Sequence, residues 1–218
     1  MVISKETLPH LAEGVLSVQR KVYKFKAAIA QGVIWTVTDA VIFRKQLEIL
    51  ARAYLGCDRN LKPLNLLTCT LMHIADDPQK VKQVKWCGSG TNMITYDYDG
   101  KSYGCHLFTP VVLGDKAVES KNLDYTCRQS IEDPHCQKCH LKSVCPTCAG
   151  FNYRYRGSPA KRDHSWCRMV EAQMQVACIF QIKKLARLKH FTEHEKMLAR
   201  YAYEALDVLK TSKVPVSE

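Results

Sequence analysis

The residues Cys136-Gln-Lys-Cys139-His-Leu-Lys-Ser-Val-Cys145-Pro-Thr-Cys148 carry the strongest structural signal in this sequence. They form two C-x2-C pairs with five residues between the pairs. A C-x2-C turn directs two sulfur atoms at one ion, because the bent backbone between them donates N–H groups to the sulfurs. Four cysteines suit tetrahedral Zn²⁺, but paired zinc knuckles normally lie about 12–20 residues apart. The short spacing favours distributing these sulfur atoms over two metal sites.

Cysteine is abundant in the whole chain, with 11 cysteines among 218 residues. The count is odd, and a chain of this length can build a core. The sequence turns polar directly after Met1-Val-Ile3, so it does not begin with a secretory signal. These features argue against a disulfide scaffold and favour metal or cluster ligation. Hydrophobic residues make up 46% of the chain, and no apolar run is long enough to span a membrane. We therefore expect a folded, cytoplasmic protein without a membrane partner.

The chain is basic, with 32 Lys and Arg against 21 Asp and Glu, which gives a formal charge of +11. Two [4Fe–4S] clusters held by thiolates would lower this charge to roughly +7. The closest approach to a nucleic-acid-binding pattern is Tyr153-Arg-Tyr-Arg156 followed by Lys161-Arg162. A solvated surface with Lys and Arg at helix ends is the simpler explanation of the charge, so we expect no nucleic-acid partner.

Residues 1–64 alternate between strand and helix patterns. Met1-Val-Ile3 is a short apolar strand, and residues 33–37 are β-branched or aromatic and predict a second strand. Asp39 is expected to cap the second helix, which Gly56 ends. The apolar stripes expected at helical spacing are Leu8, Leu11, Val15 and Val18 in the first helix and Phe43, Leu47, Leu50 and Tyr54 in the second. This order predicts parallel strands, but two such units cannot close a barrel, so the region resembles part of a larger α/β structure.

The rest of the chain changes character twice. A β-hairpin is predicted over residues 94–105, where Asp99-Gly100 is a type I′ turn signal. Residues 122–166 hold five cysteines but few periodic apolar residues, so they need something besides a hydrophobic core to order them. The helical pattern returns at Cys167, and Thr192-Glu-His-Glu195 is a capping box that opens a last helix.

The order of the cysteines matches a family pattern. Cys87-x12-Gly100-x4-Cys105, the four cysteines quoted first, and then Cys167 resemble the SPASM domain of radical S-adenosylmethionine enzymes. One spacing departs from that family, which usually has three residues where Cys145-Pro-Thr-Cys148 has two. The resemblance implies an α+β fold, in which residues 1–64 are the last βα units of a partial, TIM-like barrel. Residues 65–189 would be the SPASM domain, with a hairpin, cluster-binding loops and helices, and residues 190–218 a C-terminal helix and tail.

The same resemblance implies two auxiliary [4Fe–4S] clusters. The ligands implied for the first cluster are Cys87, Cys105 and Cys148. The ligands implied for the second cluster are Cys136, Cys139, Cys145 and Cys167.

The first cluster lacks its fourth cysteine. Sulfatase-maturing relatives have it just before the Cys87 position, where residues 80–86 contain none. Cys127 or Cys69 could substitute, Cys127 being preferred, or one iron could keep an open position. That Cys127 binds no metal is an equally acceptable alternative. Cys57 and Cys178 fall in helical segments and are most simply small core residues.

The residue after the hairpin cysteine is His106, where sulfatase-maturing relatives carry an aspartate that takes a proton from the substrate. Histidine can act as a base near neutral pH, and it is the candidate catalytic residue. A position beside the cluster without catalysis is the simpler interpretation. The acids Asp97, Asp99 and Asp163 are also explained by turn and surface roles. We therefore expect modification of a peptide or protein other than a sulfatase, such as a small precursor peptide.

No C-x3-C-x2-C motif for the S-adenosylmethionine-cleaving cluster occurs in the chain. We expect that the chain cannot start the radical reaction, and that it is a carboxyl-terminal part or works beside a separate catalytic chain. Whether it is itself an enzyme is therefore left open. In the full-length parent, S-adenosylmethionine would supply the radical and a ferredoxin or flavodoxin the electrons. The alternative is a zinc-binding interaction module without catalysis.

Overall fold

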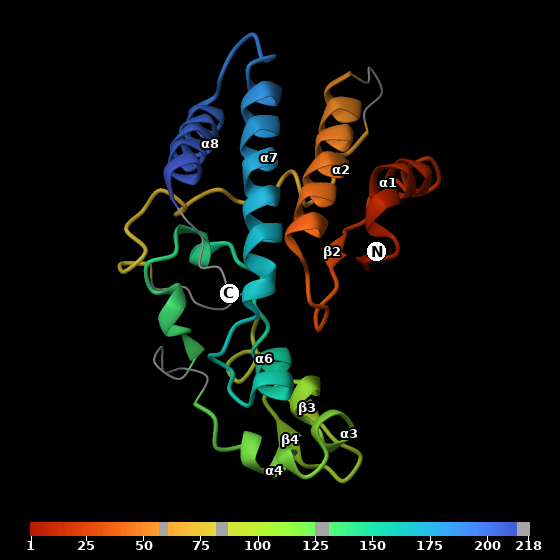
Figure 1. Cartoon of the computed structure of the whole chain (residues 1–218), viewed down its shortest axis with the longest axis vertical. Helices are drawn as coiled ribbons and strands as arrows, with labels where there is room; N and C mark the ends of the chain where they lie inside the picture. Colours follow the sequence, from red (N-terminus) through yellow and green to blue (C-terminus); the bar gives the residue numbers. More distant parts are fainter. Residues whose placement is uncertain (57–60, 82–86, 125–130, 213–218) are drawn as a thin grey trace. The chain divides into compact units, whose positions relative to one another are not determined.

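A computed structural model describes residues 1–56, 61–81, 87–124 and 131–212. The chain divides into two compact units, whose elements are labelled in Figure 1. We call Met1–Pro78, Cys139–Val144 and His164–Glu218 the helical unit. We call Gln79–Lys138 and Cys145–Asp163 the hairpin unit. The domain boundaries expected from the SPASM resemblance stay a prediction.

The helical unit begins with a short parallel strand pair. Its elements are β1 (Val2–Ile3), η1 (Leu8–His10), α1 (Leu11–Gln19), β2 (Ala28–Ile29), α2 (Val37–Gly56), η4 (His140–Ser143), η5 (His164–Trp166), α7 (Cys167–Leu185) and α8 (Glu193–Thr211). β1 confirms the strand predicted at the start of the chain, and it pairs in parallel with β2. The strand predicted at residues 33–37 is wrong, because β2 lies earlier and α2 already begins at Val37. The aromatic residue behind that prediction, Trp35, is instead buried, and its indole N–H donates to the Ala30 carbonyl at 3.3 Å.

Three long helices build the core of this unit. α2 packs along α7, and α7 packs along α8, as Figure 1 shows. The predicted stripe of Phe43, Leu47 and Leu50 on α2 is fully buried. The rings of Tyr54 and Phe180 meet edge to face, with their centroids 6.2 Å apart. Within the described residues, no helix is long and apolar enough to cross a bilayer.

Two details of the first helices differ from the expectation. Leu8, Leu11 and Val15 are buried as predicted, but Val18 at the end of α1 is 37% exposed. α2 is capped by Thr36 and not by Asp39. The Asp39 N–H donates to Thr36 Oγ1 at 3.1 Å, and its carboxylate accepts from the Thr36 N–H at 2.8 Å. Asp39 therefore occupies the third helical position of a reciprocal cap, where a carboxylate satisfies the exposed N–H.

α8 begins with the capping box that the sequence predicts. Thr192 Oγ1 accepts from the Glu195 N–H at 3.2 Å, and the Glu195 carboxylate accepts from the Thr192 N–H at 2.9 Å. This N–H donor lowers the pKa of Glu195. Because the folded pKa is lowered, the contribution of Glu195 to stability is present at neutral pH and is lost as the pH falls through that pKa.

We predict that Thr192→Ala lowers the free energy of unfolding by about 1 kcal/mol, since it removes the oxygen that caps α8. Urea denaturation followed by circular dichroism measures this difference. Thr211→Ala, at the other end of the same helix, is the matched control and should change the free energy by less than about 0.5 kcal/mol. Equal effects of the two substitutions would show that the cap contributes nothing.

The hairpin unit is built from short elements. They are β3 (Thr95–Tyr96), β4 (Ser102–Tyr103), η2 (His106–Phe108), α3 (Pro110–Leu113), α4 (Lys116–Ser120), η3 (Pro134–Cys136) and α6 (Ala149–Arg156). β3 and β4 are antiparallel, so the predicted hairpin is confirmed. Its small core consists of Tyr103, Cys105, Phe108, Ala117, Ala149 and Tyr153. A buried cysteine thus belongs to the packed centre of this unit.

The hairpin turn is not of the predicted type I′. The Asp97 carbonyl accepts from the Gly100 N–H at 2.9 Å, and Gly100 has a φ of 77°. A type I′ turn would require positive φ at Asp99 as well, which it does not have. Instead, the Asp99 carboxylate accepts from the Lys101 N–H at 3.0 Å. The turn is therefore a type I turn followed by a left-handed glycine, a common form of longer hairpin loop.

Candidate metal centre

Cys105 is positioned by the hairpin. It follows β4 and precedes η2, whose first turn it caps in an extended conformation. Its Sγ accepts from the Leu107 N–H at 3.5 Å. The side chain is buried in the small core of the hairpin unit, so its sulfur has a defined place.

Cys148 is positioned by α6. It is the residue that precedes this helix, and the backbone N–H groups of Phe151 and Gly150 act to lower the pKa of its thiol. Unsatisfied N–H groups at a helix N-terminus favour negative charge, which a thiolate ligand supplies. The sulfur is therefore placed where the backbone stabilises its ionised form.

Cys87 opens a tight turn that is joined to the hairpin. The Gly88 carbonyl accepts from the N–H groups of Asn92 and Met93, at 2.8 and 2.7 Å. The Gly90 N–H donates to the Gly104 carbonyl at 2.9 Å. Because Gly104 directly precedes Cys105, this bond brings the Cys87 turn to the hairpin cysteine.

A glycine permits α6 to approach η2. A Cβ added to Gly150 would lie 2.6 Å from Leu107 Cβ and 2.9 Å from Leu107 Cδ1, distances that real side chains do not adopt. Gly150 is two residues after Cys148, and Leu107 is two residues after Cys105. The close packing of these two residues therefore holds the two cysteines at neighbouring helix starts.

The thiol of Cys148 has a raised pKa. Burial is the largest cause that raises the pKa of Cys148, and its backbone donors act in the opposite direction. The thiols of Cys105 and Cys87 raise the pKa of Cys148 further, which requires that they lie nearby. Three neighbouring thiolates repel one another unless a cation lies among them. The three ligands implied for the first cluster thus belong to one unit, and the first cluster itself stays a prediction.

His106 lies beside this group, whereas the alternative acids have structural roles. His106 is exposed, and its Nδ1 is 3.7 Å from Cys105 Sγ. Asp97 and Asp99 order the hairpin turn through the backbone N–H groups that follow them. Asp163 forms an ion pair with Arg156 at 3.4 Å. The imidazole is therefore the titratable group next to the three thiols that we retain as a candidate.

The implied ligands of the second cluster belong to both units. Cys136 and Cys145 belong to the hairpin unit, and Cys136 is buried at the end of η3. Cys139 precedes η4 and Cys167 begins α7, and both belong to the helical unit. The second cluster stays a prediction.

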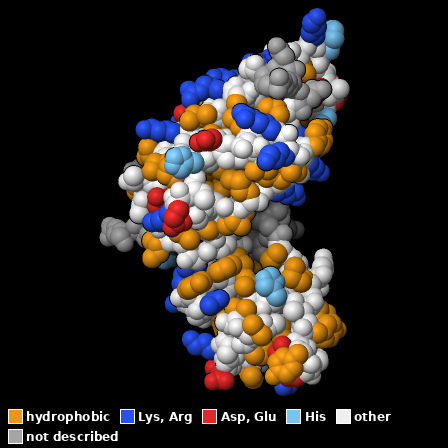
Figure 2. Space-filling view, turned by 90° about the vertical axis from the view of Figure 1, so that its right-hand side faces the viewer, with side chains coloured by type: hydrophobic (Ala, Val, Ile, Leu, Met, Phe, Trp, Pro, Cys, Tyr) orange, Lys and Arg blue, Asp and Glu red, His pale blue; other side chains and the backbone are white. Residues whose placement is uncertain are grey.

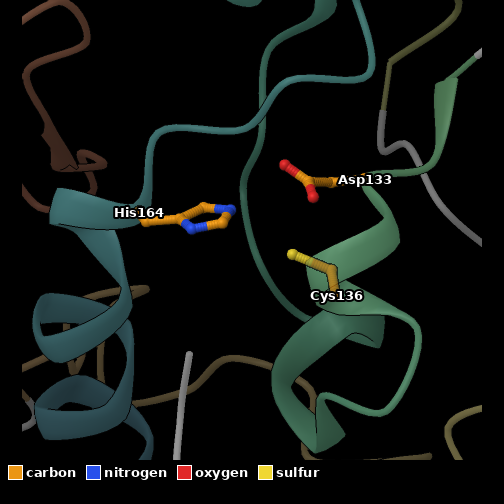
Figure 3. A group of neighbouring side chains, drawn as sticks. All are labelled: Asp133, Cys136 and His164. Atoms are coloured by element: carbon orange, nitrogen blue, oxygen red, sulfur yellow. The ribbon is translucent and has the colours of Figure 1, made fainter. Parts of the chain in front are cut away.

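Asp133 orders the turn that carries Cys136. Figure 3 shows these two side chains together with His164, each of which offers a potential ligand atom. The Asp133 carboxylate accepts from the N–H groups of His135 and Arg162, at 2.9 and 2.8 Å. His164 begins the last segment of the helical unit, so we assign no metal to the three. The two hydrogen bonds that Asp133 accepts fix the polypeptide around Cys136.

Two further described cysteines, Cys69 and Cys178, belong to the helical unit. Cys178 is fully buried in α7, which confirms its prediction as a core residue, and burial raises its pKa to about 12. Cys69 belongs to the helical unit, where its Sγ is 3.6 Å from the Leu66 carbonyl and burial raises its pKa to about 11. Cys57 and Cys127 lie outside the described residues.

The basic stretch after Cys148 is largely used within the hairpin unit. The Arg156 guanidinium donates to the Lys161 carbonyl and to Asn152 Oδ1, both at 2.9 Å. Arg162 is buried. The face shown in Figure 2 carries Lys and Arg side chains interspersed with hydrophobic ones. These contacts support a structural role for the stretch and a solvated role for other basic residues.

Comparisons with known proteins do not extend these observations. No protein-family model, curated protein or solved structure matches this chain. The relation to radical S-adenosylmethionine enzymes therefore rests on the cysteine pattern and is a proposal.

Proposed function

We propose that this chain is the auxiliary cluster-binding portion of a radical S-adenosylmethionine enzyme with a SPASM domain. The parent enzyme would modify a peptide or protein after translation. The observation that supports this proposal is that Cys87, Cys105 and Cys148, the ligands that the cysteine pattern implies for one cluster, all belong to the hairpin unit, where the thiols of Cys105 and Cys87 help to raise the pKa of Cys148. A bound [4Fe–4S] cluster would supply an electron acceptor there. Cys136, Cys139, Cys145 and Cys167 would hold the second cluster.

The residues of the hairpin unit have separable tasks in this proposal. Cys105 and Cys148 would hold the cluster from the starts of η2 and α6. The N–H groups of Gly150 and Phe151 would stabilise negative charge on the Cys148 sulfur. His106, exposed beside Cys105, could accept or donate a proton at its imidazole at the edge of the site. In this proposal, the peptide substrate and the electron donor are those of the parent enzyme.

A zinc-binding interaction module is the second candidate. One contact favours it, namely the 3.7 Å distance between His106 Nδ1 and Cys105 Sγ. Three cysteines with one histidine are a common ligand set of structural zinc sites. In that case the hairpin unit would be a small metal-stabilised fold without catalysis.

Metal analysis of the chain purified without oxygen tests these two functions. We expect a brown protein with about eight irons per chain, because two [4Fe–4S] clusters contain that number. Colourless protein with about one or two zinc ions would instead support the interaction module. Absorbance spectroscopy and elemental analysis of the same sample give both measurements, and protein without either metal would contradict both functions.

A further inference from the structure

The helical unit contains a cavity that no cysteine cluster uses. Its volume is about 590 Å³, and it lies between α7, α8 and residues 68–72. The hydrophobic residues that line it are Leu71, Met72, Phe180, Leu185, Leu188, Met197, Leu198 and Tyr201. This volume is within the range of about 300–1,000 Å³ typical of small-molecule sites, which are also mostly apolar.

Hydrophobic side chains continue from the cavity to the surface. Met72, Leu188 and Met197 line the cavity and are 40%, 38% and 36% exposed. A cluster of half-exposed apolar residues around an apolar hollow is characteristic of a binding site, because contact between apolar surface and water is unfavourable in free energy. The polar group of Gln181 on the wall is already satisfied, since it donates to the carbonyls of Leu67 and Cys69 at 3.1 and 2.9 Å.

The cavity lining carries one lysine, one histidine and one glutamate. Lys184 on α7 and His194 on α8 both line it, and both are exposed. Glu195 is the acidic residue in the lining, but its carboxylate accepts hydrogen bonds from the N–H and the hydroxyl of Thr192, at 2.9 and 2.8 Å. A carboxylate held in a helix cap is less able to pair with Lys184. Lys184 is therefore the basic group at this cavity that can face the anionic end of a ligand with an apolar body.

We propose that this cavity binds an amphipathic carboxylate of fatty-acid type. The alkyl chain would lie between α7 and α8, and the carboxylate would lie at the rim beside Lys184. Neither metal nor cluster takes part, so the proposal is independent of the function proposed above.

Titration of the full chain with decanoate, decanol and decylamine, below the concentrations at which they form micelles, tests this proposal by calorimetry. We expect saturable binding with decanoate tightest and decylamine weakest. Because an exposed ion pair contributes about 0.2–1 kcal/mol, decanoate should bind roughly 2–5-fold more tightly than decanol. Absence of saturable binding, or equal binding of decanoate and decanol, would overturn the assignment.

Substituting two neighbouring lysines one at a time distinguishes the effect of the charge at the cavity from the effect of the net charge of the chain. Lys184→Gln should remove the preference for decanoate and leave decanol binding unchanged. Lys183→Gln is the matched control, because Lys183 lines a different hollow with α2 and should leave the preference intact. Both positions are exposed, so both variants should fold, which circular dichroism verifies. The same loss of preference in both variants would show that only the overall charge matters.

Discussion

Cys148→Ala is expected to remove about four of the eight irons from the anaerobically purified chain and to halve its brown absorbance. The substitution removes one of the three sulfur ligands proposed for the first cluster, all of which belong to the hairpin unit. Iron analysis and the visible spectrum of wild type and variant measure the loss.

Two further cysteine variants define what this result means. Cys178→Ala is the matched control, since this fully buried thiol belongs to the core of α7 and should leave the iron content unchanged. Cys139→Ala should remove the other cluster and leave the one in the hairpin unit, so that its iron loss adds to that of Cys148→Ala. Full iron content in Cys148→Ala would contradict the first cluster. Loss of all iron in either single variant would contradict the division into two sites.

Gly150→Ala is expected to reduce the iron of the same cluster although it changes no ligand. The new Cβ would lie 2.6 Å from Leu107 Cβ, so α6 and η2 must move apart. Overpacking of this kind costs about 1–3 kcal/mol, and the movement separates Cys148 from Cys105. Urea denaturation and iron analysis give the two effects.

A second substitution and a control make this test specific. Leu107→Gly removes the atoms that the new methyl group would meet, so the double variant should regain iron relative to Gly150→Ala. Gly14→Ala in α1 is the matched control, because its Cβ would meet nothing within 4 Å. It should stabilise the chain by up to about 1 kcal/mol, since alanine favours helix. Unchanged iron in Gly150→Ala would show that the approach of α6 to η2 does not position the cysteines.

Local signals were the most reliable guide to the secondary structure. The capping box at Thr192, the helix that ends at Gly56 and the hairpin over residues 94–105 depend on neighbours in the sequence, and all three are present. The strand at residues 33–37 was wrong because β propensity reflects burial as well as pairing. Trp35 satisfies that preference by packing in the core without a partner strand.

The candidate site shows the same distinction. The resemblance of the cysteine order to SPASM domains implied Cys87, Cys105 and Cys148 as one ligand set. It did not reveal the role of Gly150, because Leu107, the residue it must clear, lies 43 positions earlier.

Residue order therefore established the chemistry available to this chain, namely clustered thiols, a hairpin, and helices with defined caps. Packing established how closely η2 and α6 approach, and that a cavity lined by Lys184 lies between α7 and α8. The physical reason is range: caps and turns are contacts between neighbours in the chain, whereas ligand convergence and cavities arise from side chains that folding brings together from distant segments.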